Sequence, residues 1–235
     1  MTPAALMSLL EATWPAFAQH RCGPFTLREG RGGGQRVSAA TAEGGFAAAD
    51  LEAAELAMQA MGQDPLFLIR EGDAALDQAL AARGYRVHDP VLGYAASISA
   101  LRGDVSGMAA FVHWPPLAIA ADLWAEGGIG PGRLAVMDRA AGPKAAILGR
   151  SDDTPSGAAF VVCAEGAAML HALQVRPALR RRGAARNMMQ AAINWAAEQG
   201  VHDFAVVVTE ANAPARALYD DMGFAPVTRY HYRVK

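Results

Sequence analysis

The stretch V-R-P-A-L-R-R-R-G-A-A-R, from Val175 to Arg186, decides how this chain is interpreted. It holds five arginines, although the formal net charge of the 235 residues is only -2. Residues 167–175 before it have the composition of a strand, and residues 183–199 have a helical period that ends at Gly200. The arginines are therefore expected at a junction between a strand and a helix.

Such a junction suits an anion, because the first amides of a helix have no intrahelical acceptor and its N-terminus carries roughly +0.5 of an elementary charge. Gly183 and Ala185 leave the backbone open to phosphate oxygens. Four side chains add charge-assisted donors: Arg180, Arg181, Arg182 and Arg186. The alternatives are a solvated basic helix start and a nucleic-acid patch, and the lack of aromatic residues between the arginines weighs against the patch.

The overall composition limits the class of protein. With 52% hydrophobic and 19% charged residues, the chain can bury a substantial core. A pI near 6.3 argues against binding nucleic acid or an acidic membrane with the whole surface, so any anion site is local. Cys22 and Cys163 belong to no C-x-x-C pair, so neither a disulfide nor a metal site is expected.

The N-terminus favours a first helix over an export signal, because it has no basic region and Glu11 interrupts the apolar run. No segment reaches the ~18 apolar residues of a membrane span. We therefore expect a cytoplasmic protein without nucleic-acid or membrane partners. The preference for Arg and Ala over Lys is typical of a bacterium with a GC-rich genome.

Periodicity and turn residues predict a mixed α/β order of elements. In the first half, helices are expected at 2–18, 47–61 and 74–83, and strands at 24–29, 35–41, 65–70 and 91–98. Residues 103–116 are expected to be a connection, 117–126 a helix, and 133–139 either a helix or an extended piece. The rest of the chain is expected to begin with three strands, at 144–149, 157–165 and 167–175. They are followed by a helix at 183–199, a strand at 204–209, a helix from Asn212 to Gly223 and two final strands.

The glycine-rich stretch G-R-G-G-G, residues 30–34, is a candidate phosphate loop by composition. It lacks the third glycine of G-x-G-x-x-G, and no P-loop lysine follows it. We interpret it as a flexible hairpin turn between the strands at 24–29 and 35–41.

The arginine junction and its neighbours resemble the GCN5-related N-acetyltransferase (GNAT) superfamily. The acyl-CoA signature of that family, Q/R-x-x-G-x-G/A, is met by R-R-R-G-A-A at residues 180–185. M-L-H-A-L-Q-V-R-P upstream and N-A-P-A-R-A-L-Y-D-D-M-G-F downstream also resemble the family. The resemblance covers about residues 116–235 and implies a GNAT fold, with a mostly antiparallel central sheet flanked by helices.

The resemblance also implies roles for individual residues. The strand that ends at Val175 splays from its neighbour, which leaves backbone groups of Leu173 and Val175 free for the pantetheine arm, and the Leu173 amide polarises the thioester carbonyl. Tyr219 is implied as the acid that protonates the CoA thiolate. Because its ordinary pKa of about 10 exceeds about 8.5 for a thiol, donation also requires proximity and local stabilisation. The expected cofactor-binding set is Leu173, Gln174, Val175, Arg180, Arg181, Arg182, Gly183, Ala184, Ala185, Arg186 and Asn212.

The sequence does not decide which residue acts as the general base. His171 lies in the strand where some family members use histidines to deprotonate the amine, but Met169 stands where a second histidine would be expected. The alternative is a histidine whose hydrogen bonds are satisfied within the sheet. Glu165 and Glu210 are fallback bases. Tyr219 could be a packed helix tyrosine, Asn212 a helix N-cap, and Asp220 and Asp221 part of a solvated helix face.

The first half of the chain resembles a degenerate copy of the same fold. P-L-F-L-I-R followed by A-L-D-Q-A-L-A-A-R-G-Y-R-V is similar to F-A-V-V-V-T followed by A-R-A-L-Y-D-D-M-G-F-A-P-V, and Tyr219 corresponds to Leu80. No acyl-CoA signature lies in this half. We expect a GNAT-like N-terminal half at 1–102, a connection at 103–116 and a catalytic GNAT domain at 117–235.

The expected function is transfer of an acetyl group from acetyl-CoA to a primary amine by direct attack. The acceptor is expected to be a small amine or an amino-acid derivative, and alternatively a protein N-terminus or lysine. A catalytically silent acyl-CoA-binding or regulatory module is the alternative from another class. The sequence leaves open whether the protein forms a homodimer.

Overall fold

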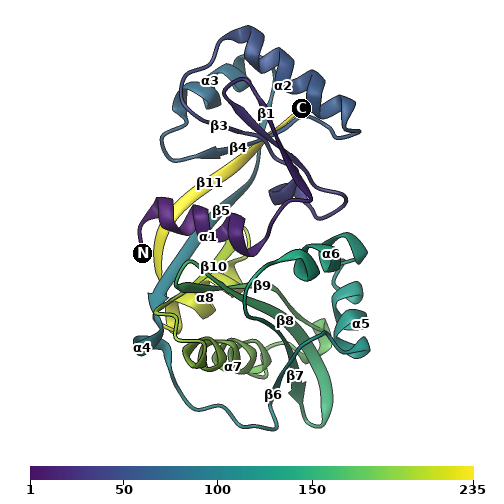
Figure 1. The fold of residues 1–235 in the computed structure, drawn as a ribbon. Helices are drawn as coiled ribbons and strands as arrows, with labels where there is room; N and C mark the ends of the chain where they lie inside the picture. Colours follow the sequence, from purple (N-terminus) through teal and green to yellow (C-terminus); the bar gives the residue numbers. More distant parts are fainter.

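The computed structural model describes all residues from 1 to 235 and is organised around one eight-stranded sheet (Figure 1). Its strands lie in the spatial order β4–β11–β5–β10–β9–β8–β7–β6. Their bounds are β4 Leu66–Arg70, β5 Arg86–Ser97, β6 Ala110–His113, β7 Lys144–Ser151, β8 Thr154–Ala164, β9 Ala167–Val175, β10 Asp203–Thr209 and β11 Ala225–Val234. Only β9 and β10 pair in parallel, so the expected mostly antiparallel α/β sheet is confirmed.

Helices cover both faces of this sheet. Alternate residues of β8 point to opposite sides, so that Ala159 and Val161 join one core while Phe160 and Val162 join another. The first core is closed by α7 (Ala184–Glu198) and α8 (Ala213–Asp221), and the second by α5 (Ala118–Glu126) and α6 (Pro131–Arg139). The short helix α4 (Ile98–Leu101) connects β5 to the following loop. No helix in the structure has the length and apolar character needed to cross a membrane.

The upper part of the molecule in Figure 1 comes from the first half of the chain, together with the end of β11. It contains a small antiparallel sheet of β1 (Ala18–Cys22), β2 (Phe25–Glu29) and β3 (Thr41–Ala42), with α2 (Ala48–Ala60) and α3 (Ala74–Ala82) around a separate core. The first helix, α1 (Pro3–Thr13), lies across the middle of the large sheet. Its buried residues Leu6, Leu9 and Leu10 pack against residues of β9, β10 and β11.

Two strands exchange places between the halves of the chain. β5 lies between β10 and β11, and β11 lies between β4 and β5. The C-terminus therefore lies in the upper part of the molecule, far along the chain from the elements beside it (Figure 1). Asp77 of α3 fixes β11 there, because it accepts hydrogen bonds from Arg233 Nε at 2.7 Å and His231 Nε2 at 2.8 Å. The Arg233 hydrogen bond, aided by His231, lowers the pKa of Asp77 although burial opposes the shift.

Several expected elements differ from the observed ones. The strand expected at 35–41 is wrong: a 3-10 helix, η1 (Gln35–Val37), is followed only by the two residues of β3. The two strands expected at the end are one continuous strand, β11, because residues 225–234 contain no turn. The connection expected at 103–116 contains β6, an edge strand with a single neighbour and hence a weak sequence pattern.

The start of the chain also differs from expectation. α1 is shorter than the expected helix, because it ends at Thr13 and Trp14 precedes a proline, which disfavours helical backbone. β1 then begins at Ala18, the last residue of the expected helix, and continues through residues 19–22, for which no element was expected. The region at 133–139, which the pattern left undecided, is the helix α6.

Candidate active site

The parallel pair β9–β10 separates half-way along its length. The two strands are paired from Ala167 opposite Asp203 to Leu170 opposite Val206, and no further. β9 then contains a bulge, since Phe160 of β8 pairs with His171 but Ala158 pairs with Gln174. The bulge residue Ala172 has a φ of 52°, and its carbonyl accepts a hydrogen bond of 2.8 Å from Trp124 Nε1. The strand is therefore redirected where the pairing stops.

The redirected end of β9 leaves backbone groups open. The Arg176 amide donates to the Ser156 carbonyl of β8 at 2.9 Å. Because successive residues of a strand point their backbone groups to opposite edges, Gln174 also faces β8, whereas Leu173 and Val175 face the side that β10 has left. The Val175 carbonyl on that side accepts a hydrogen bond from Arg180 Nε at 3.1 Å.

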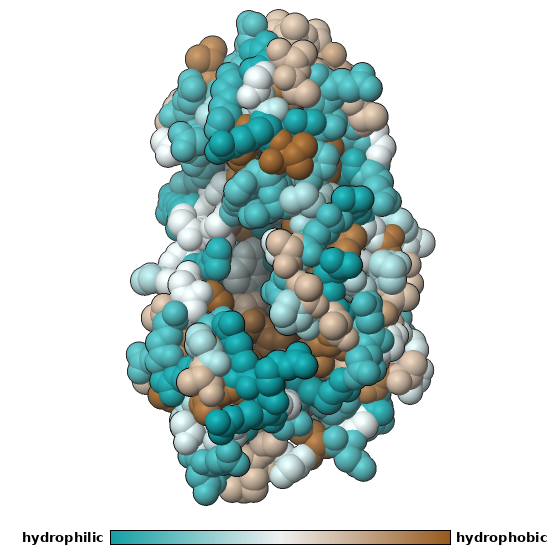
Figure 2. All heavy atoms as spheres, turned by 180° about the vertical axis from the view of Figure 1, so that it is seen from behind, coloured by the Kyte–Doolittle hydropathy of each residue, from teal (hydrophilic) through white to brown (hydrophobic).

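A cavity of about 530 Å3 lies at this separation, and we call it the β9–β10 cavity. Four residues predicted from the sequence line it: His171, Leu173, Asn212 and Tyr219. The face shown in Figure 2 is hollowed near the middle of the molecule, with hydrophobic residues deep in the hollow and hydrophilic residues around its rim. The lining of the β9–β10 cavity combines apolar side chains with charged and polar ones, as small-molecule sites commonly do.

Tyr219 reaches the cavity from α8. Its side chain is buried, with 5% exposed, and its ring packs against Tyr94 and Phe224. Burial, together with the nearby Tyr94, raises the pKa of Tyr219 to about 12. The phenol therefore carries its proton at neutral pH. Asn212 caps α8 by accepting a hydrogen bond from the Ala215 amide at 3.2 Å.

His171 lies on the opposite face of β9 from the α7 core and is buried. Arg36 Nη1 donates to its Nδ1 at 3.2 Å, since a guanidinium can only donate. Its Nε2–H donates at 3.0 Å to the Thr13 hydroxyl, which itself donates to the Leu9 carbonyl at 2.6 Å. Burial, with the charge of Arg36, lowers the pKa of His171 well below its usual range. This geometry favours a satisfied, neutral histidine over a general base.

The arginine junction lies where β9 leads into α7. The short helix η2 (Pro177–Leu179) precedes it, and Gly183 begins α7 with a φ of 82° and no side-chain cap. The first amides of α7 are therefore available to an anion. Arg182 pairs with Asp152 at 3.3 Å, Arg186 pairs with Asp221, and Arg181 has no acidic partner.

The fallback bases lie elsewhere. Glu165 is in the turn at the far end of β9 and accepts a hydrogen bond from Ser8 at 2.9 Å. Glu210 pairs with Arg229 at 2.8 Å. Neither lines the β9–β10 cavity, and Asp89 is the only carboxylate that does.

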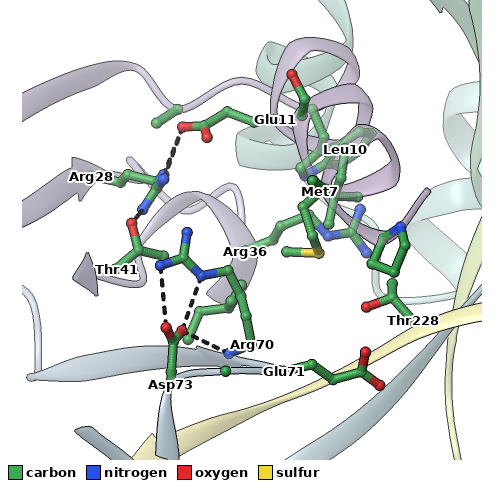
Figure 3. Close-up of a pocket in the computed structure, with 17 residues that line it drawn as sticks. Met7, Leu10, Glu11, Arg28, Arg36, Thr41, Arg70, Glu71, Asp73 and Thr228 are labelled. Carbon is green, nitrogen blue, oxygen red and sulfur yellow. Dashed lines mark hydrogen bonds and ion pairs between the residues drawn. The ribbon is translucent and has the colours of Figure 1, made fainter. Parts of the chain in front are cut away.

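Figure 3 shows a second cavity, of about 640 Å3, beneath α1, which we call the α1 cavity. Arg28 on its wall pairs with Glu11 at 2.9 Å, and Arg70 pairs with Asp73 at 3.0 Å. Arg36 extends between these groups and the residues of α1. Trp14 and Arg36 line both cavities, so these two side chains separate them.

Sequence reasoning expects the first half to shape the acceptor pocket, but it named none of the residues that this half contributes. Trp14, Gly33, Gly34 and Arg36 line the β9–β10 cavity although they lie more than a hundred residues before it. The sequence feature that could have indicated this contribution is the glycine-rich stretch, residues 30–34, because glycines allow another segment of backbone to approach closely. A Cβ on Gly132 of α6 would lie 2.4 Å from the Gly32 carbonyl oxygen.

Gly33→Ala is expected to destabilise the protein, because the added Cβ would lie 2.6 Å from Val136 Cγ2 and 2.7 Å from Val37 Cγ2. Overpacking of this kind typically costs about 1–3 kcal/mol. Gly45→Ala is the matched control, since nothing lies within 4 Å of its added Cβ. Urea unfolding measures both variants, and equal midpoints would mean that the loop does not pack tightly on α6.

Comparisons with known proteins agree with this geometry. The model of the family "Acetyltransferase (GNAT) family" matches residues 88–224, more than half of the chain. "Uncharacterized N-acetyltransferase YobR" of Bacillus subtilis (strain 168) is 24% identical over 237 residues, covering 97% of this chain and 96% of that protein. The structure of a GCN5-related N-acetyltransferase from Kribbella flavida has a TM-score of 0.73 and 18% identity, covering 99% of this chain and 95% of the other.

A tandem GNAT protein from the clavulanic acid biosynthesis pathway also has a similar structure, with a TM-score of 0.58 and 15% identity over 98% of this chain and 87% of the other. The chain belongs to the GNAT family of acetyltransferases. It is an N-acetyltransferase by family, and members generally transfer an acetyl group from acetyl-CoA to an amine.

Proposed function

We propose that this protein transfers an acetyl group from acetyl-CoA to a primary amine of a small molecule by direct attack. The observation that carries the proposal is the open edge of β9 at Leu173 and Val175, which continues into the uncapped start of α7. Such an edge can hold an extended amide-containing arm, and the helix start can hold its pyrophosphate. Both features fit one acyl-CoA molecule.

The residues that hold acetyl-CoA are proposed along this path. Leu173 and Val175 bind the pantetheine arm through the backbone, and Gln174 between them holds this part of β9 to β8. The anion site is the junction of Arg180, Arg181, Arg182, Gly183, Ala184, Ala185 and Arg186, and Asn212 lies beside the reacting end. When bound, acetyl-CoA supplies an activated acetyl thioester.

The proposed reaction is a nucleophilic substitution at the acetyl carbonyl. The free amine nitrogen forms a bond to the acetyl carbon, and the carbon–sulfur bond breaks. The Leu173 amide stabilises the charge on the carbonyl oxygen, a donation typically worth about 3 kcal/mol of barrier. Tyr219 donates its proton to the departing sulfur. The proton lost by the amine passes to Asp89 or to water, since His171 already directs its lone pair at Arg36.

We also propose that the chain is a tandem protein, with the division at 1–102, 103–116 and 117–235. The exchange of strands supports it: β4, α3 and β5 have the same order as β10, α8 and β11, and each half places its last strand inside the sheet of the other. The N-terminal half then forms a wall of the acceptor site, because Trp14 and Arg36 belong to it.

A screen of small amines with acetyl-CoA tests the function by detecting the released thiol. We expect turnover with at least one primary amine, and mass spectrometry should find the product heavier by one acetyl group. Thiol release without any amine product would instead indicate hydrolysis. Tight acetyl-CoA binding without turnover of any amine would favour a silent acyl-CoA-binding module.

A further inference from the structure

The guanidinium of Arg36 lacks an acidic partner. η1 places the side chain beneath α1, where Arg28 and Arg70 on the walls of the neighbouring cavity each pair with a carboxylate. Arg36 Nη1 donates to His171 Nδ1, the guanidinium also lies within reach of the buried Tyr232 hydroxyl, and its Nε is buried without any acceptor. A partly buried guanidinium with unused donors is costly, because it has given up water without gaining an acceptor.

The groups around Arg36 leave its positive charge uncompensated, so a ligand can still pair with it. The neutral imidazole of His171 supplies a hydrogen bond but no negative charge, and the Trp14 ring lies 6.0 Å from the guanidinium carbon. The hydroxyls of Tyr230 and Tyr232, which also line the β9–β10 cavity, are buried close to each other, and neither has a charged acceptor. A carboxylate is the group that matches a planar guanidinium in a bidentate manner, and a hydroxyl can add a further donor to it.

The cavity also carries one opposite charge. Asp89 lies in the bulge of β5 opposite β11, with a φ of 42° that non-glycine residues rarely adopt. Such strain is commonly retained at functional positions. Its carboxylate lies 3.3 Å from His88 Nε2, and both side chains are substantially exposed. Arg133 also lines the cavity and has no acidic partner. A cavity with two guanidinium groups that no carboxylate pairs, and with one carboxylate, complements a molecule that carries a carboxylate and an ammonium group.

We propose that the acceptor is an amino carboxylate, such as an amino acid, whose carboxylate binds Arg36 and whose amine faces Asp89. This inference rests on the proposed function, because the amine must lie where Leu173 and Tyr219 line the same cavity. Arg36 is then the residue that determines specificity for the acceptor. His171, supported by Thr13, positions it through the bond to Nδ1.

Matched pairs of amines test the proposal: L-amino acids against their carboxamides, and phosphoethanolamine against ethanolamine. The amine of a carboxamide is less basic, so more of it is unprotonated, and a preference for the acid cannot come from amine reactivity. We expect kcat/KM to be at least about 100-fold higher for the preferred acid than for its amide, the size expected from losing a charge-assisted pair. Arg36→Gln should remove this preference, and Arg36→Lys should retain part of it.

Arg31→Gln is the matched control, because Arg31 lies in the glycine-rich stretch just before η1 but pairs with Glu29 at 2.7 Å. It should keep the ratio of acid to amide unchanged. The ratio within each variant is the informative readout, since a purely structural role of Arg36 would lower both rates together. Calorimetric titration of the same acids and amides into protein saturated with CoA measures binding where turnover is slow.

The outcomes separate this proposal from the function on which it rests. Equal rates for acids and amides, a preference for phosphoethanolamine alone, or an undiminished acid preference in Arg36→Gln would each overturn it. Absence of both binding and turnover for every acid would also overturn it. In these cases acetyl-CoA binding with turnover of neutral amines would leave the proposed function standing, whereas absence of acetyl-CoA binding would remove both.

Discussion

Gly183→Glu is expected to abolish acetyl-CoA binding while leaving the fold intact. A ligand that binds only the folded protein stabilises it by about 2.7 kcal/mol at 100 times its dissociation constant. For a chain of this size, 1 kcal/mol raises the melting temperature by about 2–4 °C, so the wild type should gain roughly 5–10 °C. The variant should gain nothing, because its carboxylate occupies the helix start where the phosphate would approach the free amides.

Gly200→Glu is the matched control for this experiment. Gly200 follows the other end of α7, has a φ of 76° and, like Gly183, has no atom within 4 Å of an added Cβ. Both substitutions therefore impose a similar left-handed strain of about 1–2 kcal/mol. Only Gly183→Glu should lose the thermal shift. An equal shift in the two variants would show that acetyl-CoA binds away from the arginine junction.

Tyr219→Phe is expected to lower turnover by about 100-fold to 10,000-fold, the usual contribution of a general acid. The ring keeps its packing against Tyr94 and Phe224, so acetyl-CoA affinity and stability should change little. The pKa of Tyr219, raised to about 12, means that the wild-type phenol remains protonated up to that pH. Wild-type turnover should therefore show no alkaline loss from this group below about pH 11.

Tyr94→Phe is the control, because it removes a phenol from the neighbouring ring, which is not part of the cavity wall. Turnover should be nearly that of the wild type. If Tyr219→Phe kept full activity, Tyr219 would be a packed tyrosine and another group or water would protonate the thiolate. If Tyr94→Phe lost as much activity as Tyr219→Phe, the effect would come from packing.

The elements predicted with the smallest errors are those with strong local patterns. α2, β4, α3, β9, α7 and β10 begin and end within two residues of their expected bounds, because periodicity and terminal glycines act within a few residues. The expected strand at 35–41 failed because packing against α6 and α1, not local preference, decides that segment. β6 was missed for the related reason that a four-residue edge strand is stabilised mainly by its neighbour.

The residues of the candidate site likewise fall into those with a local sequence pattern and those without one. Leu173 and Tyr219 lie in motifs whose residues are close together in the chain, and the structure places both on the wall of the β9–β10 cavity. The roles of these two residues and of Gly183 stay predictions. The role of His171 could not be predicted from the sequence, because it depends on Arg36, which is 135 residues away. No spacing rule predicts that an arginine in the short helix η1, after the glycine-rich stretch, will direct a donor at that imidazole.

The sequence by itself determined the mixed α/β order of elements, the arginine junction at a helix start and the resemblance to acetyltransferases, because each depends on neighbouring residues and their local backbone preferences. Only the tertiary structure decided that β5 and β11 exchange places in the sheet and that Arg36 and Asp89 face one cavity. These features require segments distant in the chain to be brought together. Their positions follow from which apolar faces can be buried at once, and no short segment contains that information.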